Sequence, residues 1–267
     1  MKFTQINETD SDSLIENTYQ MTIESSDLPY EDIVIPVGKS VLNYTCSSEE
    51  IELEHYENLI RYKEAFMFGQ FFGHYKISTN KECCNCGITF KPSALYKLFG
   101  KPGADYKNDI VRLEEYDKSF YQKIIDVLKT CNSDLKVFTE EVKKIISNLS
   151  YTIDENTKWI DRTIEIIEEK KGLVKVKDLL DEVPFSQKSL ETHFKKIIGL
   201  TPNQYIRQYR FVNLIRDYQS GFIDVKKLIE TYNYYDASHF TKDLLFFTGQ
   251  NPKTFFKTDH PLIESYL

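Results

Sequence analysis

The chain has 267 residues, more than the roughly 100 to 200 of an ordinary single domain, so we expect two domains. Its 34 basic and 41 acidic residues give a formal net charge of -7, which excludes a protein that binds nucleic acid over its whole surface. Five cysteines, an odd number, favour a reducing compartment in which thiols stay free.

The first 20 residues are polar, with Asp10 and Asp12 among them, and they lack the basic start and apolar run of a signal peptide. No run of about 18 apolar residues occurs in the chain, so no membrane-spanning helix and no membrane partner are expected. Together these features predict a cytoplasmic protein.

The N-terminal half is rich in β-forming residues and is punctuated by glycine. Apolar runs at residues 33–35 and 65–72 predict strands. Residues 88–90, followed by apolar positions from Leu95 to Phe99 and then Gly100, predict a strand that passes into a short helix ended by glycine.

Four aromatic residues of this half are candidates for the lining of an effector pocket: Phe66, Phe68, Phe72 and Tyr75. Aromatic residues at alternating strand positions more commonly fill a core, and this second interpretation is favoured. No effector-binding residue is therefore assigned.

The closely spaced Cys83, Cys84 and Cys86 suggest metal binding, because thiolates bind zinc tightly. Structural zinc sites, however, usually space their cysteines by two to four residues and need four ligands. Adjacent Cys83 and Cys84 would point to opposite faces of a strand, and His55 and His74 could complete a set only through folding. We predict no metal and no cofactor, and a redox role of these thiols stays open.

Two longer helical segments follow the β-rich part. Their apolar stripes are Phe120, Ile124, Val127 and Leu128 in the first, and Phe138, Val142, Ile145, Ile146 and Leu149 in the second. Each stripe could pack on the β-rich part or on a second subunit, so a homodimer is left open.

The last hundred residues contain one pattern twice, about fifty residues apart. Each copy opens with apolar residues at the i, i+3, i+4, i+7 spacing of a helix face: Val176, Leu179, Leu180 and Val183, then Val225, Leu228, Ile229 and Tyr232. A helix-breaking stretch follows in each copy, and it ends at Ser186 or Asp236, residues that suit an N-cap.

A second helix begins at each cap and repeats the same buried offsets: Leu190, Phe194 and Ile197, then Phe240, Leu244 and Phe247. Gly199 and Gly249 end these helices, and Thr201-Pro202 and Asn251-Pro252 each start a further one. The pattern predicts two helix-turn-helix motifs. From Pro202 to about Ser220 one helix of roughly 27 Å joins them, close to the 34 Å between successive major grooves.

The outward faces of the two second helices carry polar side chains. These are Lys188, Glu191, Thr192 and Lys195 in the first copy, and Ser238, Thr241 and Lys242 beside Ala237 and His239 in the second. Such side chains can hydrogen-bond base edges or phosphates, or pack on a thymine methyl group. Each face alone is typical of a solvated helix surface, but the duplicated frame favours DNA contact.

The charge is unevenly distributed along the chain. From Gly172 to His260 there are 13 Lys and Arg against 10 Asp and Glu, a net of +3, while the remaining residues hold 21 against 31, a net of -10. We expect a local DNA footprint with steep salt dependence and modest non-specific affinity.

The segment from roughly Asp154 to His260 resembles the AraC/XylS-type transcription regulators, bacterial proteins whose DNA-binding domain holds two helix-turn-helix units joined by a long helix. The resemblance rests on Ser186, Leu190, Phe194, Gly199, Thr201-Pro202, Tyr205 and Arg210, then on Asp236, Ser238-His239-Phe240, Lys242, Gly249 and Pro252. It implies that DNA is contacted by Ser186, Gln187, Lys188, Glu191, Thr192 and Lys195 and by Ala237, Ser238, His239, Thr241 and Lys242.

The chain departs from the family pattern at a few positions. Leu180 and Ile229 occupy sites that are usually small, Asn233 stands where glycine is usual, and Thr192 and His193 sit where arginine is common. These departures bear on base preference more than on the fold.

A second resemblance covers residues 87–96, GITFKPSALY, which look like part of an uncharacterised sensory domain that precedes some AraC/XylS-type DNA-binding domains. It implies a small β-barrel-like input domain and brings no ligand with it.

We therefore expect an α+β protein with a barrel-like sensory or dimerisation domain at 1–150, which includes two packing helices, and an all-α DNA-binding domain at 154–260. The expected function is sequence-specific regulation of transcription, with double-stranded DNA as partner and a small-molecule or protein effector at the N-terminal domain. RNA polymerase would be recruited, as by an activator, or blocked. No enzyme is expected, because the sequence contains no nucleophilic side chain paired with a general base in a recognisable motif. The alternative is an interaction module that kept the fold without DNA affinity.

Overall fold

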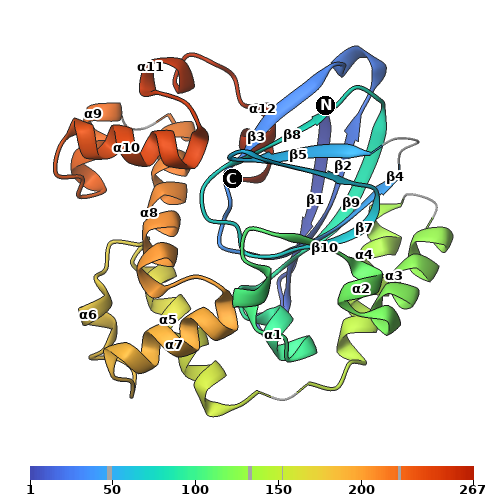
Figure 1. Ribbon diagram of the computed structural model, residues 1–267, viewed down its shortest axis with the longest axis horizontal. Coiled ribbons are helices and arrows are strands. Elements are labelled where there is room, and N and C mark those ends of the chain that lie inside the picture. The colour runs from blue at the N-terminus through green and yellow to red at the C-terminus, as the bar shows by residue number, and fades with distance from the viewer. Residues whose placement is uncertain (47–49, 132–133, 152, 222–223) are drawn as a thin grey trace.

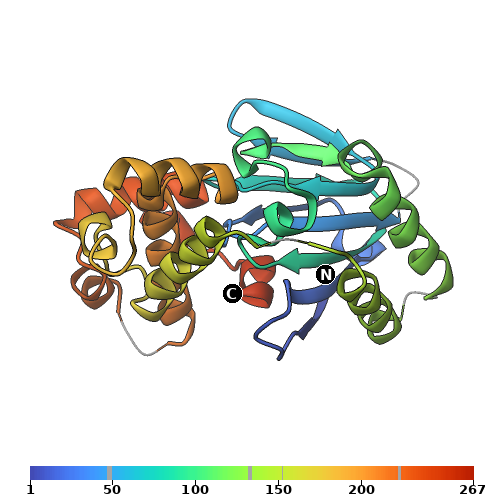
Figure 2. The ribbon, with the colours of Figure 1, turned by 90° about the horizontal axis from the view of Figure 1, so that it is seen from below.

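The structure, a computed structural model, describes the whole chain except residues 47–49, 132–133, 152 and 222–223. It has three parts side by side: β-sheets in the middle, a small group of helices on one side, and the C-terminal helices on the other (Figures 1 and 2). Within the described residues no helix is both long and apolar enough to cross a membrane.

The N-terminal half forms two antiparallel sheets, which confirms the predicted β-rich part. The larger, six-stranded sheet has the order β1-β2-β9-β4-β7-β10 and the four-stranded sheet the order β3-β8-β5-β6. The strands of the first are β1 (Lys2–Asn7), β2 (Ile15–Ile23), β9 (Cys83–Phe90), β4 (Val41–Cys46), β7 (Glu64–Phe68) and β10 (Ile110–Arg112). Those of the second are β3 (Tyr30–Val34), β8 (Tyr75–Thr79), β5 (Ile51–His55) and β6 (Asn58–Tyr62).

The apolar run at residues 65–72 is only partly a strand. β7 ends at Phe68, and the chain leaves the sheet at Gly69, where a side chain would meet the carbonyl oxygen of Tyr106 at 1.8 Å. Residues 69–74 then form a loop that runs toward the C-terminal helices. The short helix predicted after residue 90 is confirmed as α1 (Ala94–Phe99), and Gly100 ends it with a positive φ of 65°.

The two helical segments after the β-rich part pack on that part, so the first of the two predicted alternatives is confirmed. α2 (Leu113–Tyr116), α3 (Lys118–Thr130) and α4 (Leu135–Ser147) cover one face of the larger sheet. Phe120 and Phe138 are buried there against Leu42 and Ile88. The apolar stripes are thus used within the chain.

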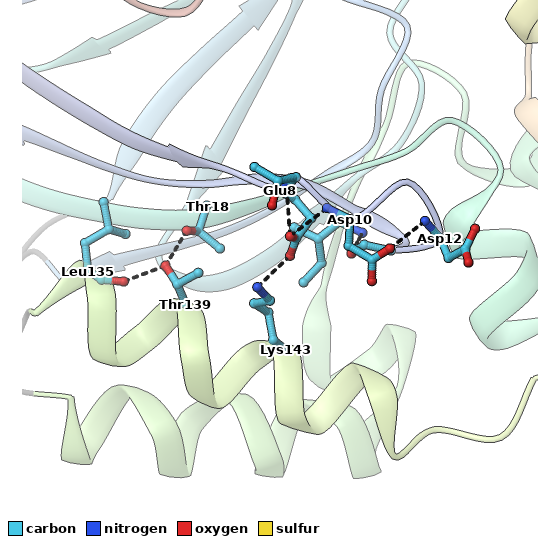
Figure 3. A network of polar contacts seen from close by, with 10 residues as sticks. Glu8, Asp10, Asp12, Thr18, Leu135, Thr139 and Lys143 are labelled. Carbon is cyan, nitrogen blue, oxygen red and sulfur yellow. Dashed lines mark hydrogen bonds and ion pairs between the residues drawn. The ribbon is translucent and has the colours of Figure 1, made fainter.

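Polar contacts fix α4 on the β1–β2 hairpin (Figure 3). The hydroxyls of Thr18 and Thr139 lie 2.6 Å apart, and Thr139 also donates to the carbonyl of Leu135. Lys143 Nζ lies 3.0 Å from Glu8, and this hydrogen-bonded ammonium lowers the pKa of the Glu8 carboxyl.

The C-terminal helices confirm the two predicted motifs. α6 (Val176–Leu179) and α7 (Gln187–Ile198) form the first, and α9 (Val225–Thr231) and α10 (Ala237–Thr248) the second. α8 (Pro202–Gln219) joins them, α5 (Glu155–Glu169) precedes them, and α11 (Pro252–Phe255) and α12 (Pro261–Tyr266) follow. α6 is shorter than predicted: it ends at Leu179, and Val183, where the following Pro184 disfavours helical backbone, lies in the turn and is nevertheless buried.

Each motif is built on its own core. Leu190, Phe194 and Ile197 of α7 pack with α5 and with the start of α8. The equivalent stripe of α10, Phe240, Leu244 and Phe247, packs with α9 and the second half of α8. All six side chains are at most 3 % exposed, so the opposite faces of both helices are turned outward.

The last helix was not predicted. α12 returns from the second motif to β3, where the Tyr266 hydroxyl accepts from the Ile35 N–H at 2.8 Å and the Leu262 N–H donates to Asp32 at 3.1 Å. The C-terminal segment therefore packs on the N-terminal half. The boundaries 1–150 and 154–260 stay a prediction.

Candidate nucleic-acid interface

α7 presents the predicted contact residues of the first motif on one exposed face. Ser186 caps the helix, its hydroxyl accepting the Ser189 N–H at 3.2 Å. Gln187 donates to Glu191 at 3.0 Å, and the Thr192 hydroxyl donates to the carbonyl of Lys188 at 2.8 Å. All the residues expected to contact DNA here are exposed: Ser186, Gln187, Lys188, Glu191, Thr192 and Lys195.

α10 presents a similar face with less charge. Asp236 caps it by accepting the His239 N–H at 2.7 Å. Ala237, Ser238, His239 and Lys242 are exposed, whereas Thr241 is half-buried and its hydroxyl donates to the carbonyl of Ala237. His239 is both exposed and in edge contact with the ring of Tyr234, at 5.1 Å between centroids.

Tyr235, directly before the α10 cap, is a surface residue that sequence reasoning missed. Its side chain is 92 % exposed, the most of any large apolar or aromatic residue described. Phe185 at the equivalent place in the first copy is half-buried and stacks on His193 at 5.3 Å. The difference between two turns of similar composition could have been found only from the packing.

A buried carboxylate holds α10 on α8. The Asp243 side chain is 2 % exposed and lies 2.8 Å from Arg207 and 3.4 Å from Arg210, both on α8. It also accepts the Tyr234 hydroxyl at 3.0 Å. Burial, and next the Asp243 charge, raise the pKa of Tyr234, so this hydroxyl stays a donor. Asp243 lies outside the predicted stripe, and nothing in the sequence pattern pointed to it.

Cations gather at the C-terminal end of α7. Lys107 from the N-terminal half donates to Gln204 at 3.1 Å, and burial together with nearby Lys195 lowers its pKa. Lys196 stands over the ring of Tyr96 at 5.4 Å. Positive side chains near an exposed helix face suit phosphate groups.

The three clustered cysteines lie on β9. Cys83 is buried on one face of that strand, while Cys84 and Cys86 are half-buried on the other. Burial raises the pKa of the Cys83 thiol to about 11 and that of Cys86 to about 12, so both are protonated at neutral pH. Among the described residues, no three His, Cys, Asp or Glu side chains are grouped so as to hold a metal ion.

A cavity of about 370 Å³ lies between the two halves of the chain. Phe68 and Tyr75, two of the four aromatic residues considered for a pocket, line it, and Phe66 and Phe72 do not. The other lining residues come from the strands of both sheets and from the helical half, which supplies Arg216 of α8 and Tyr266 of α12.

Two cations border this cavity. Lys39 Nζ lies 2.6 Å from a Glu16 carboxylate oxygen, and Arg216 Nε donates to the carbonyl of Leu267 at 3.1 Å. Tyr19, Asn43 and other polar residues add hydrogen-bonding groups to an otherwise mainly apolar and aromatic lining. The volume lies in the range of small-molecule sites.

The chain is similar to known proteins both in sequence, where the match lies in the helical half, and in overall fold. Residues 179–258 match the family model described as a helix-turn-helix domain. No curated protein sequence matches the chain.

The chain is similar to several solved structures, among them two of ToxT and one of CuxR. ToxT from Vibrio cholerae O395 bound to (E)-4-(8-methylnaphthalen-1-yl)but-3-enoic acid covers 96 % of this chain and 99 % of its own, with 10 % identity and a TM-score of 0.50. Another ToxT structure from Vibrio cholerae O395 covers 99 % of both chains at 12 % identity and a TM-score of 0.49. The AraC-like transcriptional activator CuxR covers 74 % of both chains at 12 % identity, with a TM-score of only 0.24.

The domain match covers most of the two motifs, from Leu179 at the end of α6 to Thr258 just after α11. The caps, buried stripes and C-terminal glycines described above all fall inside it. Residues 179–258 thus form a helix-turn-helix domain, in agreement with the resemblance to the AraC/XylS-type regulators seen in the sequence.

Proposed function

We propose that the protein is a sequence-specific transcription regulator that places α7 and α10 in successive major grooves of one DNA duplex. The observation that carries this proposal is the pair of exposed polar helix faces, each fixed from behind by a buried apolar stripe. α7 and α10 lie at the two ends of α8, on the side of the molecule away from α2–α4 (Figure 1). A helix enters the major groove without clash, and the 18 residues of α8 span about 27 Å.

Within α7 we propose two kinds of contact. Lys188 lies in the first turn, where the recognition helix of such motifs meets base edges, and it can donate to guanine O6 and N7. Lys195 lies two turns later, beside Lys107, and suits a phosphate. Ser186, Gln187, Glu191 and Thr192 complete this contact surface with donors and acceptors.

Within α10 the proposed contacts are Ala237, Ser238, His239, Thr241 and Lys242. Lys242 is the single cation among them, so this helix neutralises fewer phosphates than α7 does. Its share of the affinity should come mainly from hydrogen bonds and apolar contacts with bases.

We further propose that an effector binds in the cavity between the two halves. Because Arg216 and Tyr266 belong to the helical half and the strands to the other, a bound molecule would contact both and could change how the helices are presented. An apolar body with an acidic group fits the aromatic lining and Arg216, whereas the charge of Lys39 is paired with Glu16, which also lines the cavity. ToxT, which shares the fold, binds a carboxylic acid with a naphthalene ring.

Homodimers and contact with RNA polymerase remain proposals that rest on the regulator function itself. The apolar stripes of α3 and α4 are covered within the chain, so they do not support a dimer.

A mobility-shift assay tests DNA binding. Full-length protein at low salt should retain duplexes selected from a random library, and Lys188→Ala should weaken retention. Lys129→Ala removes an exposed lysine of α3 on the far side of the molecule and is the matched control, expected to bind like the wild type. Failure to retain any duplex at low salt would refute DNA binding and leave the interaction module as the better account.

Calorimetry tests the effector site. An aromatic or long-chain carboxylic acid should bind the full chain, and the alcohol of the same skeleton should bind more weakly. Arg216→Gln should reduce the difference in affinity between the acid and the alcohol. Equal binding of acid and alcohol to the wild type would reject a cationic contact.

A further inference from the structure

Phe72 lies on the loop of residues 69–74, yet its side chain packs into the cores of both helix-turn-helix motifs. It touches the first core, which is built around α5 and α7, and the second, which is built around α8, α9 and α10. Its ring lies 4.9 Å from Phe246 and 5.7 Å from Phe247 between centroids, the latter at 90°. One aromatic side chain of the N-terminal half is therefore shared by both DNA-binding motifs.

The loop that carries Phe72 is held firmly by its own half. The Phe72 N–H donates to Asn108 Oδ1 at 2.7 Å, and the Asn108 N–H donates to the Gln70 carbonyl at 3.0 Å. Gln70 is buried and donates to the Gly38 carbonyl at 3.1 Å. The neighbouring Phe71 is buried in the β core. These bonds restrain the backbone at Phe72, so the N-terminal half determines where its side chain lies.

Two loops of the N-terminal half, residues 69–74 and residues 102–109, support the C-terminal ends of the two recognition helices. Loop 69–74 meets α10, where His74 Nδ1 lies 3.0 Å from the Phe246 carbonyl and a side chain at Gly249 would collide with the His74 ring. The loop of residues 102–109, which includes the short 3-10 helix Gly103–Tyr106, meets α7, where a side chain at Gly103 would come within 2.7 Å of the Ile198 backbone. The bonds of Asn108 join one loop to the other.

Arg207 of α8 contacts the same group of aromatic rings. Its guanidinium lies 4.5 Å from the Phe246 ring centroid, 5.3 Å from Phe247 and 5.7 Å from Phe72. The same group binds the buried Asp243 of α10. A shift of the Phe72 ring would therefore disturb the cation that holds α10 on α8.

We infer that Phe72 is a positioning residue for DNA recognition: through the two joined loops, the N-terminal half fixes the distance and rotation between α7 and α10. This inference rests on the proposed function. Because two linked contacts reinforce each other only when geometry lets both form, a fixed arrangement restricts binding to one spacing of half-sites. Inserting one base pair moves the second half-site by about 3.4 Å and turns it by roughly 35°.

The test uses full-length protein and duplexes in which the two selected half-sites are moved apart or together by one and two base pairs. Wild type should lose at least about tenfold in affinity for each displaced duplex. Phe72→Ala should lose only about threefold or less, with unchanged affinity for a single half-site. Phe72→Leu keeps apolar bulk between the motifs and should restore most of the wild-type profile.

Two further variants separate positioning from general loss of structure. Phe246→Ala removes the same contact from the α10 side and should flatten the spacing profile in the same way, even if Phe72→Ala does not fold. Tyr121→Ala removes an equally half-buried ring of the N-terminal half, which lies on α3 and packs on the β-side core, away from the DNA-binding motifs. It should reduce thermal stability and keep the sharp spacing preference.

The outcomes are distinct. A sharp profile in Phe72→Ala and Phe246→Ala, or an equally flat one in Tyr121→Ala, overturns the inference while DNA binding stands. If the wild type binds no duplex, the proposed function fails and the inference fails with it.

Discussion

Replacing Asp243 by asparagine should destabilise the second helix-turn-helix motif. The carboxylate is 2 % exposed and has two arginines and the Tyr234 hydroxyl within 3.4 Å. Removing one partner of a fully buried ion pair costs about 3 to 5 kcal/mol. Because Arg207 and Arg210 are 33 % and 19 % exposed, water can solvate part of their charge, and we expect a loss of about 2 to 3 kcal/mol in the free energy of unfolding.

The loss corresponds to a fall of roughly 5 to 10 °C in the unfolding temperature of a protein of this size. Far-UV circular dichroism during heating measures it, since the C-terminal half is helical. Asp126→Asn on α3 is the control, because Asp126 is exposed and its carboxylate accepts a hydrogen bond from Gln122. The Thr130 hydroxyl donates to the backbone carbonyl of Asp126, which the substitution leaves in place. If Asp243→Asn unfolded within about 0.5 kcal/mol of the wild type, the role assigned to this buried pair would be wrong.

Three more predictions concern DNA binding and pH. Lys188→Ala should cost about 1 to 3 kcal/mol and relax base preference at one position, whereas Lys195→Ala should weaken all sequences alike and lower the salt dependence by about one unit; equal binding by wild type and both variants would reject the assignment. Tyr235→Ala should reduce affinity for the second half-site about three- to tenfold through a lost apolar contact with bases or sugars, with thermal stability unchanged because the side chain is 92 % exposed. Unchanged affinity would exclude Tyr235 from the interface. Burial lowers the pKa of His74, so its neutral form is favoured in the fold: the stability this gives is complete above about pH 6.5 and is lost as the pH falls through that value toward the lowered pKa. The unfolding temperature of the wild type should therefore fall more steeply on acidification than that of His74→Gln. Parallel plots of unfolding temperature against pH would contradict the lowered pKa of His74.

The C-terminal half could be predicted closely because its signals are local. Ser186 and Asp236 as caps, Gly199 and Gly249 as helix ends, and the buried stripes depend on residues at most a few turns apart. The extent of α6 was overestimated, because helical periodicity continued to Val183 although Pro184 prevented the helix from doing so.

The sheets could be predicted only as strands. Their order depends on pairings between distant segments, such as β9 with both β2 and β4, which no local pattern encodes. Phe72 illustrates the same limit for the site. Within an apolar run it looked like one more strand residue, and its contact with both motifs arises only from the way the two halves pack.

The charge around α10 was also hidden from sequence analysis. Arg207 and Asp243 lie 36 positions apart, and their pairing follows from the crossing of α8 and α10. The predicted DNA-contact residues, by contrast, could be selected by helical periodicity and by resemblance together, and the structure brings them onto two exposed faces.

The most direct test of the central claim is selection of duplexes from a random library by the full-length protein. The two helix faces predict bound sequences with two short conserved blocks whose centres lie about one helical turn, roughly 10 base pairs, apart. Blocks at that spacing, with base preference relaxed at one position of the block contacted by α7 in Lys188→Ala, would agree with recognition by both helices. A single block, or no enrichment at any salt concentration, would contradict it.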